Sequence, residues 1–319
     1  MKAKTIIMTT LATVVLAACS NDENNVINSG PSKATFTATI AGQVNTRVYD
    51  QTWNEGDLIG VSGMSGGVPY TNVQYETING DGNFTISNPG DEIYFQDGNT
   101  VTFTAYYPWA EFTQDSPVII ADTRMQASQS TFDFLWSQQT GSKIKPHVSF
   151  TFAHKMAKLV LTIKGGTDVS YHEVQRAVLS LRGFKNNGSF NVTDGTAAAT
   201  DDDLTTDWTF AGNTTETGYN APSSKDDAKG TVAYTLILFP QEFSAPLPIT
   251  ATLTGSQSFS ATLDFTTANR NAGDTEARNE WVAGRQYNLS VTLHKTGFTV
   301  DGCTIQEWDE ADGGNVDAD

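Results

Sequence analysis

Serine, histidine and aspartate residues supply the first chemistry to consider, because together they could build a catalytic centre. The segment Gly63–Gly67 matches the G-x-S-x-G pattern that presents a nucleophilic serine, here Ser65. That pattern exposes its serine only where a strand precedes it and a helix follows. The run that follows, VPYTNVQYE, has an early proline and a β-rich composition. We interpret the segment as a glycine-rich hairpin loop and predict no catalytic residue.

Metal ligation is the second possibility. His147 and His154 lie on one expected strand, and an odd separation places them on opposite faces of it. Asp201–Asp203 could offer oxygen ligands, but the run lacks the spacing and the bidentate glutamate of an EF-hand loop. The acidic run is better read as a solvated loop. The sequence therefore predicts neither a metal site nor a cofactor.

Cys19 carries the chemistry that the sequence supports best. Lys2 and Lys4 precede a short apolar run, Thr5–Leu16, and the segment closes with Leu-Ala-Ala-Cys. The apolar run is too short for a membrane span, which needs roughly 20 residues, and is typical of a signal peptide. Residues 1–18 are the predicted signal peptide, and Cys19 is the predicted lipid-attachment site. An ordinary secretory peptide with an accidental cysteine is the alternative.

The residues after Cys19 suggest where the chain goes. A serine, not an aspartate, follows the cysteine, and the acidic Asp22 and Glu23 come next, which favours export to the outer face of a Gram-negative outer membrane. Residues 19–33 have little apolar content and are the predicted tether. Once Cys19 is acylated, Cys303 is the only cysteine left with a free thiol, so no disulfide is expected within the chain. We expect Cys303 to act as a small packed hydrophobe.

The net charge of the chain limits the classes of partner that it can bind. The chain has 36 acidic residues against 19 lysines and arginines, giving a net charge of −17. A phosphate backbone would be repelled, so nucleic-acid binding is disfavoured. Direct attraction to anionic lipid headgroups is disfavoured for the same reason.

Short alternating runs predict an all-β chain. In ATFTATI, which begins at Ala34, apolar and threonine side chains alternate as in a half-buried strand. Similar runs of four to ten residues, bounded by Gly, Asn, Asp or Pro, continue to Trp308, as in sandwiches and barrels. The polar stretch GSKIKP suggests a boundary, which gives two predicted β-sandwich domains, 34–145 and 146–308. Residues 309–319 are the predicted acidic tail.

Short motifs follow one another in a fixed order, from just after the first expected strand almost to the acidic tail. In chain order they are Thr46–Asp50, Trp53–Val61, Phe103–Pro108, Phe150–Leu159, Leu238–Gln241, Trp281–Tyr287 and Ile305–Trp308. Together, in this order, they resemble the fimbrillin family. The resemblance implies two tandem transthyretin-like, Greek-key β-sandwiches that serve as a subunit of type V pili. It also implies other fimbrial subunits as partners and attachment to the outer membrane through an N-terminal lipid.

The resemblance further implies assembly by donor-strand exchange. A protease cut after Arg47 would leave Val48 as the new N-terminus and release the first strand. A strand from a neighbouring subunit would then fill the groove by β-augmentation. The implied donor of this chain is 298–308, with Phe298, Val300, Ile305 and Trp308 as its apolar side chains. Its apolar residues change parity around Gly302, which predicts a bulge or two short strands. An ordinary last strand of the second domain, and an uncut Arg47 in a surface turn, are the alternatives.

Two other functions stay open. The chain could be a surface lipoprotein that binds a glycan or host ligand on the same scaffold, with Trp208, in a polar insertion, as the best expected aromatic contact. An extracellular hydrolase that uses Ser65 is the weaker alternative.

Overall fold

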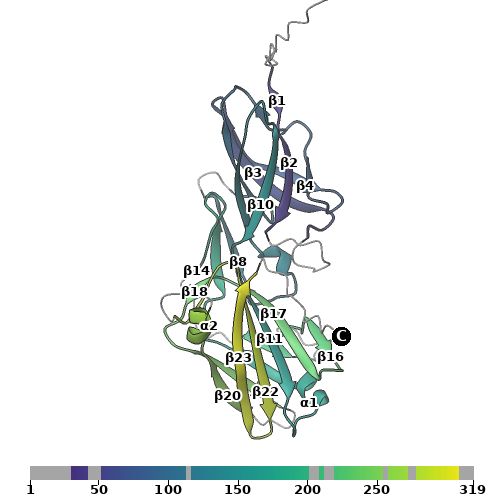
Figure 1. Cartoon of the computed structure of the whole chain (residues 1–319), viewed down its shortest axis with the longest axis vertical. Coiled ribbons are helices and arrows are strands. Elements are labelled where there is room, and N and C mark those ends of the chain that lie inside the picture. Colours follow the sequence, from purple (N-terminus) through teal and green to yellow (C-terminus); the bar gives the residue numbers. More distant parts are fainter. Residues whose placement is uncertain are drawn as a thin grey trace, which may run out of the picture.

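The computed structural model describes residues 30–41, 52–112, 116–200, 208–211, 219–253, 258–271 and 278–308. The signal peptide, Cys19, most of the tether, Arg47, Val48, Asp201–Asp203 and the acidic tail lie outside the described residues. The described chain is almost entirely β and forms an elongated molecule with two halves, one above the other in Figure 1. None of its helices is long and apolar enough to cross a membrane.

The first half is a closed barrel of seven strands around an aromatic core. The strands follow the order β10 (His147–His154), β2 (Thr35–Ile40), β5 (Asn83–Ile86), β4 (Val68–Thr77), β3 (Asp57–Ser65), β7 (Val101–Tyr107) and β9 (Leu135–Gly141). The expected alternation is present in β2, where Phe36, Ala38 and Ile40 are buried. The prediction of an all-β, sandwich-like fold is confirmed, and in this half the strands close on themselves.

The strand β10 corrects the predicted domain boundary. It was expected to open the second domain at residue 146, but it pairs in parallel with β2, from His147 opposite Thr35 to Phe152 opposite Ile40. Its other edge meets β9, which closes the barrel. The first half therefore extends through His154. The physical reason is that Val148, Phe150 and Phe152 belong to the same buried cluster as Phe36.

The start of the fold also differs from the prediction by two residues. Ser32–Lys33, expected at the end of the tether, form β1 and pair with β6 (Tyr94–Phe95). Lys33 reaches Glu92, with 3.3 Å between the ammonium nitrogen and the carboxylate oxygen.

The second half is a sandwich of two sheets. One sheet has the order β16 (Ser224–Asp226), β17 (Thr231–Leu238), β11 (Ala157–Gly165), β22 (Arg285–His294) and β23 (Gly297–Glu307). The other has the order β15 (Trp208–Ala211), β12 (Val178–Leu181), β19 (Leu247–Thr252) and β20 (Ser258–Leu263). Side chains from both sheets fill one large apolar core. The short helices α1 (Tyr171–Arg176) and α2 (Thr266–Asn271) connect strands of this half.

A third core joins the halves. A small sheet of β14 (Thr196–Ala199), β13 (Asn187–Asn191) and β8 (Val118–Asp122) lies there, with the 3-10 turn η1 (Gln129–Thr131). The short pair β18 (Gln241–Glu242) and β21 (Glu280–Trp281) places Trp281 in the core of the second half. Because β8 pairs with β13, a segment predicted for the first domain shares a sheet with a strand predicted for the second. The buried side chains of this junction core are Tyr106, Phe132, Phe134, Met156, Phe190, Val192, Ile237, Phe239 and Trp308.

Candidate functional site

The first strand, β2, sits in a slot that its own side chains fill. Ala34, just before it, and Phe36, Ala38 and Ile40 within it are each at most 5% exposed. The ring centroid of Phe36 lies 4.9 Å from that of Tyr75, 5.5 Å from that of Phe103 and 5.7 Å from that of Phe150. Because β2 separates β10 from β5, its loss would open a groove lined by these rings.

The hydrogen bonds of β2 are uneven on its two sides. Toward β10 they form a continuous parallel ladder, whereas toward β5 the register covers only Phe36 opposite Phe84 and Thr37 opposite Asn83. Beyond that, the Ala38 amide donates to the carbonyl of Gly82 at 2.8 Å. The Trp53 indole N–H donates to the Ala38 carbonyl at 2.9 Å. The end of β2 is thus held partly by a side chain from the next segment of the chain.

Gly82 makes this close approach possible. It has a φ of +77°, and a Cβ atom there would lie 2.3 Å from the carbonyl oxygen of Ala38. We expect Gly82→Ala to lower the free energy of unfolding by about 1–2 kcal/mol through left-handed strain, and by a further 1–3 kcal/mol through the clash. Gly67→Ala is the matched control, because Gly67 has a φ of +81° with nothing within 4 Å of the added atom. Urea unfolding of both variants measures the difference, and equal losses would contradict the close contact with β2.

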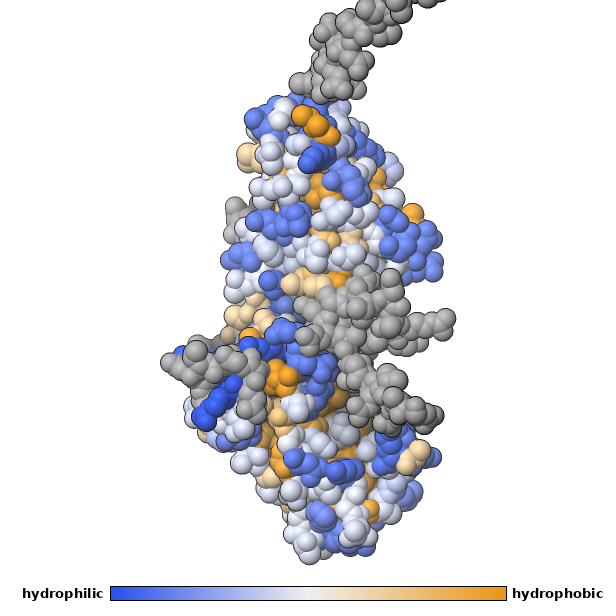
Figure 2. All heavy atoms as spheres, in the orientation of Figure 1, coloured by the Kyte–Doolittle hydropathy of each residue, from blue (hydrophilic) through white to orange (hydrophobic). Residues whose placement is uncertain are grey.

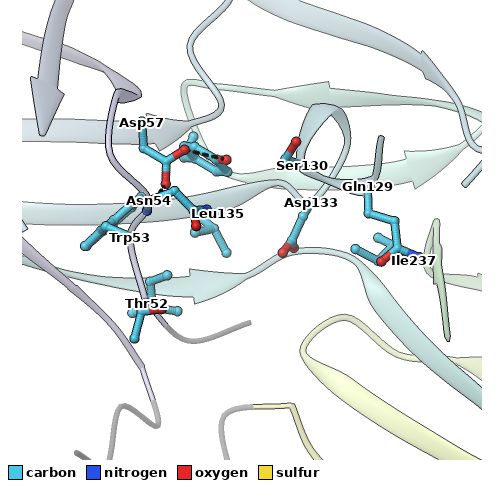
Figure 3. A pocket seen from close by; sticks show the side chains of 11 residues that line it. Thr52, Trp53, Asn54, Asp57, Gln129, Ser130, Asp133, Leu135 and Ile237 are labelled. Atoms are coloured by element: carbon cyan, nitrogen blue, oxygen red, sulfur yellow. Dashed lines mark hydrogen bonds between the residues drawn. The ribbon is translucent and has the colours of Figure 1, made fainter. Parts of the chain in front are cut away.

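A small cavity lies where β2 ends and the chain re-enters the barrel (Figure 3). Its volume is about 130 Å³, and Ile40, Thr52, Asp57 and Asp133 are among the residues that line it. Burial raises the pKa of the Asp57 carboxyl above its usual range, against the backbone hydrogen bond from Asn54. Ligand pockets typically measure about 300–1,000 Å³, so this cavity is small for a sugar or a cofactor. Among the described residues, no group of three or more His, Cys, Asp or Glu side chains is arranged to hold a metal ion.

The last strand, β23, is paired along its length with β22. The ladder runs from Arg285 opposite Glu307 to His294 opposite Gly297, and the register shifts between Ser290 and Val291. The shift leaves Asp301 as the extra residue, which confirms the bulge predicted near Gly302. Val300, Cys303 and Ile305 pack against the core, as the change in parity requires. Cys303 is therefore the packed side chain that was expected, and its burial raises the pKa of the thiol to about 12.

Trp308 fastens the end of β23 to the junction of the halves. Its ring stacks on His154, with centroids 3.9 Å apart and planes 7° from parallel. His154 Nδ1 lies 2.9 Å from an Asp133 carboxylate oxygen. The Trp308 amide donates to the carbonyl of Gly284 at 2.7 Å. The predicted opposite orientation of the two histidines is confirmed, because His147 is exposed and His154 is buried.

The four candidate donor residues of β23 lie in different surroundings. Val300 and Ile305 face the second sandwich, and Trp308 enters the junction core. Phe298 stands opposite Leu293 in the ladder. The junction cluster of His154, Asp133 and Trp308 was not predicted as a unit. The only local signal was His154 inside a family motif, since stacking between residues so distant in sequence leaves no pattern.

Two expectations about exposed side chains are settled by burial. Trp208 was the best candidate for an exposed aromatic contact if the chain binds a glycan, but it is only 2% exposed and packs against Phe184 in the second core, so its expected exposure is wrong. The insertion reads as polar, yet Trp208 begins β15 and turns inward. Ser65 is 1% exposed, and its hydroxyl accepts from the Gln96 amide at 2.9 Å, at the end of the predicted β3–β4 hairpin. This serine is not presented as a nucleophile.

An open groove elsewhere contains a partly exposed tryptophan. Its volume is about 430 Å³, within the range of ligand sites, and Trp109, Tyr70 and Gln74 are among its lining residues. The Trp109 indole N–H donates to the carbonyl of Asn72 at 3.3 Å. If the chain binds a glycan, Trp109 is better placed for it than Trp208.

Comparison with known proteins agrees with this architecture. A candidate fimbrium subunit of Bacteroides uniformis, Fim1C, is 30% identical over 325 residues, covering 98% of each chain. A solved structure of a candidate cell adhesion protein from Bacteroides ovatus superposes with a TM-score of 0.69 at 23% identity, covering 88% of this chain and 98% of that one. A second, from Bacteroides uniformis, has a TM-score of 0.65 at 26% identity, covering 87% and 98%. Residues 46–308 match the sequence profile described as fimbrillin-like, and the chain belongs to that family.

Proposed function

We propose that the chain is a structural subunit of a cell-surface fimbria, exported as a lipoprotein acylated at Cys19 and assembled by donor-strand exchange. The slot of β2 is the observation that carries the proposal. A single short strand fills it, and its neighbour β5 contributes little pairing. The candidate cleavage site, Arg47, follows Ile40 by only a few residues. A cut there would detach β2 from everything that follows it in the chain.

A strand from another subunit is a suitable replacement for β2. The slot presents main-chain groups of β10 on one side and buried aromatic rings beneath, so an incoming strand gains a ladder and side-chain pockets together. It must supply small and large apolar side chains at alternate positions, as Ala34, Phe36, Ala38 and Ile40 do.

The donor proposed for this chain is 298–308, with Phe298, Val300, Ile305 and Trp308. Donation requires β23 to leave β22 and Trp308 to leave His154. We therefore propose that release of the Trp308 end precedes donation. The partners are other fimbrial subunits, and the N-terminal lipid connects the chain to the outer membrane.

Limited trypsin treatment of the purified chain tests this function. We expect a new N-terminus at Val48, loss of the β2 peptide from the folded product, and polymers that survive mild denaturant. Arg47→Ala should abolish both the cut and the polymers, whereas Arg278→Ala, a control at an exposed arginine paired with Glu242, should leave them unchanged. N-terminal sequencing and size-exclusion chromatography give the readout. Cleavage at Val48 with β2 retained and no polymers would reject strand exchange.

A further inference from the structure

One end of the barrel carries exposed apolar side chains beside lysines. Met64 is 63% exposed, Val68 is 42% exposed and Ile144 is 75% exposed. They are half of the large apolar residues that the described chain leaves exposed, the others being Ile78, Ile120 and Met125. Figure 2 shows apolar atoms next to strongly hydrophilic ones at this end of the molecule.

The register of the strands places these residues at one end. Met64 and Val68 belong to the β3–β4 hairpin, in which Ser65 stands opposite Val68. The hydroxyl of Ser65 is bonded to Gln96, which directly follows β6. Ile144 lies in the turn between β9 and β10, and Gly141 at the end of β9 stands opposite Val101. The strand β1 pairs with β6 at the same end, at the top of Figure 1.

The turn that holds Ile144 has a defined shape. The Ser142 amide donates to the carbonyl of Lys145 at 3.1 Å. The Lys145 amide donates to the Ser142 hydroxyl at 3.3 Å. Within this turn, Lys143 and Lys145 flank the exposed Ile144. An apolar tip with a lysine on each side suits a lipid–water interface, because the alkyl chains can lie along the apolar layer while the ammonium groups reach phosphates.

Charges at this end are balanced, unlike those of the whole chain. Lys33 is paired with Glu92. The carboxylate of Asp97 accepts from the backbone and side chain of Asn99 at 3.0 and 2.7 Å. Among the described residues of this end, Asp91 is a further acid, and Lys143 and Lys145 carry two positive charges. With a net charge of −17, the rest of the protein is repelled by an anionic surface, so this end is the part that can approach one.

We propose that this end of the barrel, with Ile144 at its tip, rests on a phosphate-bearing lipid surface while the chain is lipid-anchored. The inference rests on the proposed acylation of Cys19. Twelve residues lie between Cys19 and Ser32 at the start of β1, so this stretch of chain spans at most about 45 Å even when fully extended. The anchor therefore keeps this end close to the bilayer, and the second half, with β23, points away from it.

Site-specific fluorescence on the full lipidated chain tests the contact. Two variants, Ile144→Cys and the control Ile78→Cys, each carry a polarity-sensitive dye on the introduced thiol. Both also carry Cys303→Ser, so that the dye attaches at one position only. Ile78 is 56% exposed and follows β4, at the other end of the barrel. In vesicles of phosphatidylethanolamine and phosphatidylglycerol we expect a blue-shifted emission at position 144, with several-fold stronger quenching by lipid-borne nitroxides than at 78. Lys143→Glu with Lys145→Glu should remove most of that difference.

The outcomes separate this inference from the proposed function. Mass spectrometry of the N-terminus first establishes that Cys19 is acylated, and the trypsin assay tests assembly independently. Equal quenching at positions 144 and 78 in acylated protein would overturn the membrane contact and leave fibre assembly untouched. A shift at 144 that arises on polymerisation without vesicles would also overturn it, because the apolar end would then be a contact between subunits.

Discussion

A Phe36→Ala chain is expected to lose about 3–5 kcal/mol of its free energy of unfolding, the usual cost of deleting a fully buried phenylalanine. Phe36 is 2% exposed and touches three other aromatic rings, so its loss leaves a cavity that rigid neighbours cannot fill. Urea denaturation followed by fluorescence measures the change. The urea titration of the variant is best started at low temperature and without denaturant, because a loss of this size is a large fraction of typical domain stability.

The same substitution separates two roles of β2. Thr39→Ala is the control, since Thr39 lies on the same strand but faces solvent, and it should change stability by no more than about 0.5 kcal/mol. After cleavage at Arg47, the Phe36→Ala peptide should leave its slot faster than the Thr39→Ala peptide, because a cut strand is held only by noncovalent contacts. Equal release rates would mean that side-chain burial does not limit the exchange of this strand.

Local alternation made much of the fold predictable. The strand at 34–40, the hairpin at Gly66 and the bulge beside Gly302 all follow from the parity or turn chemistry of neighbouring residues, and the structure contains each of them. Such signals depend on a few consecutive residues, which is why a single sequence carries them. The order of family motifs added the identity of the family.

Long-range pairing set the limit of sequence analysis. GSKIKP looks like a linker because it is polar and ends in proline, yet it is the β9–β10 turn inside the barrel. Nothing near His147 records that its partner is Thr35, more than a hundred residues earlier. The expected exposure of Trp208 was wrong for a related reason, since the acidic residues around it gave no sign that its side chain packs in the second core. Polar residues next to a side chain in the sequence predict that it is exposed only when the order of the strands in the sheets is also known.

Trp308→Ala is expected to lower the free energy of unfolding by about 3–5 kcal/mol, as for other buried aromatic residues. Trp308 is 2% exposed and joins the last strand to the junction core. Glu307→Ala, one residue earlier and exposed, is the control and should change stability little. In a double-mutant cycle with His154→Ala, the stacked pair should show a coupling of about 0.5–1.5 kcal/mol. A coupling of zero would mean that burial alone, without the stack, holds Trp308 in place.

The behaviour of Trp308 during assembly distinguishes the two interpretations of β23. As an ordinary last strand, β23 keeps its ladder with β22 in the polymer, and its amides should stay protected from hydrogen exchange before and after assembly. As a donor, it must first withdraw Trp308 from His154, so Trp308→Ala should loosen β23 in the monomer and speed its release. In that case the amides of β22 opposite Val300 and Ile305 lose their partners on assembly, and their protection falls. Hydrogen exchange on wild type and Trp308→Ala, before and after trypsin, therefore decides whether 298–308 is given to a neighbour or kept.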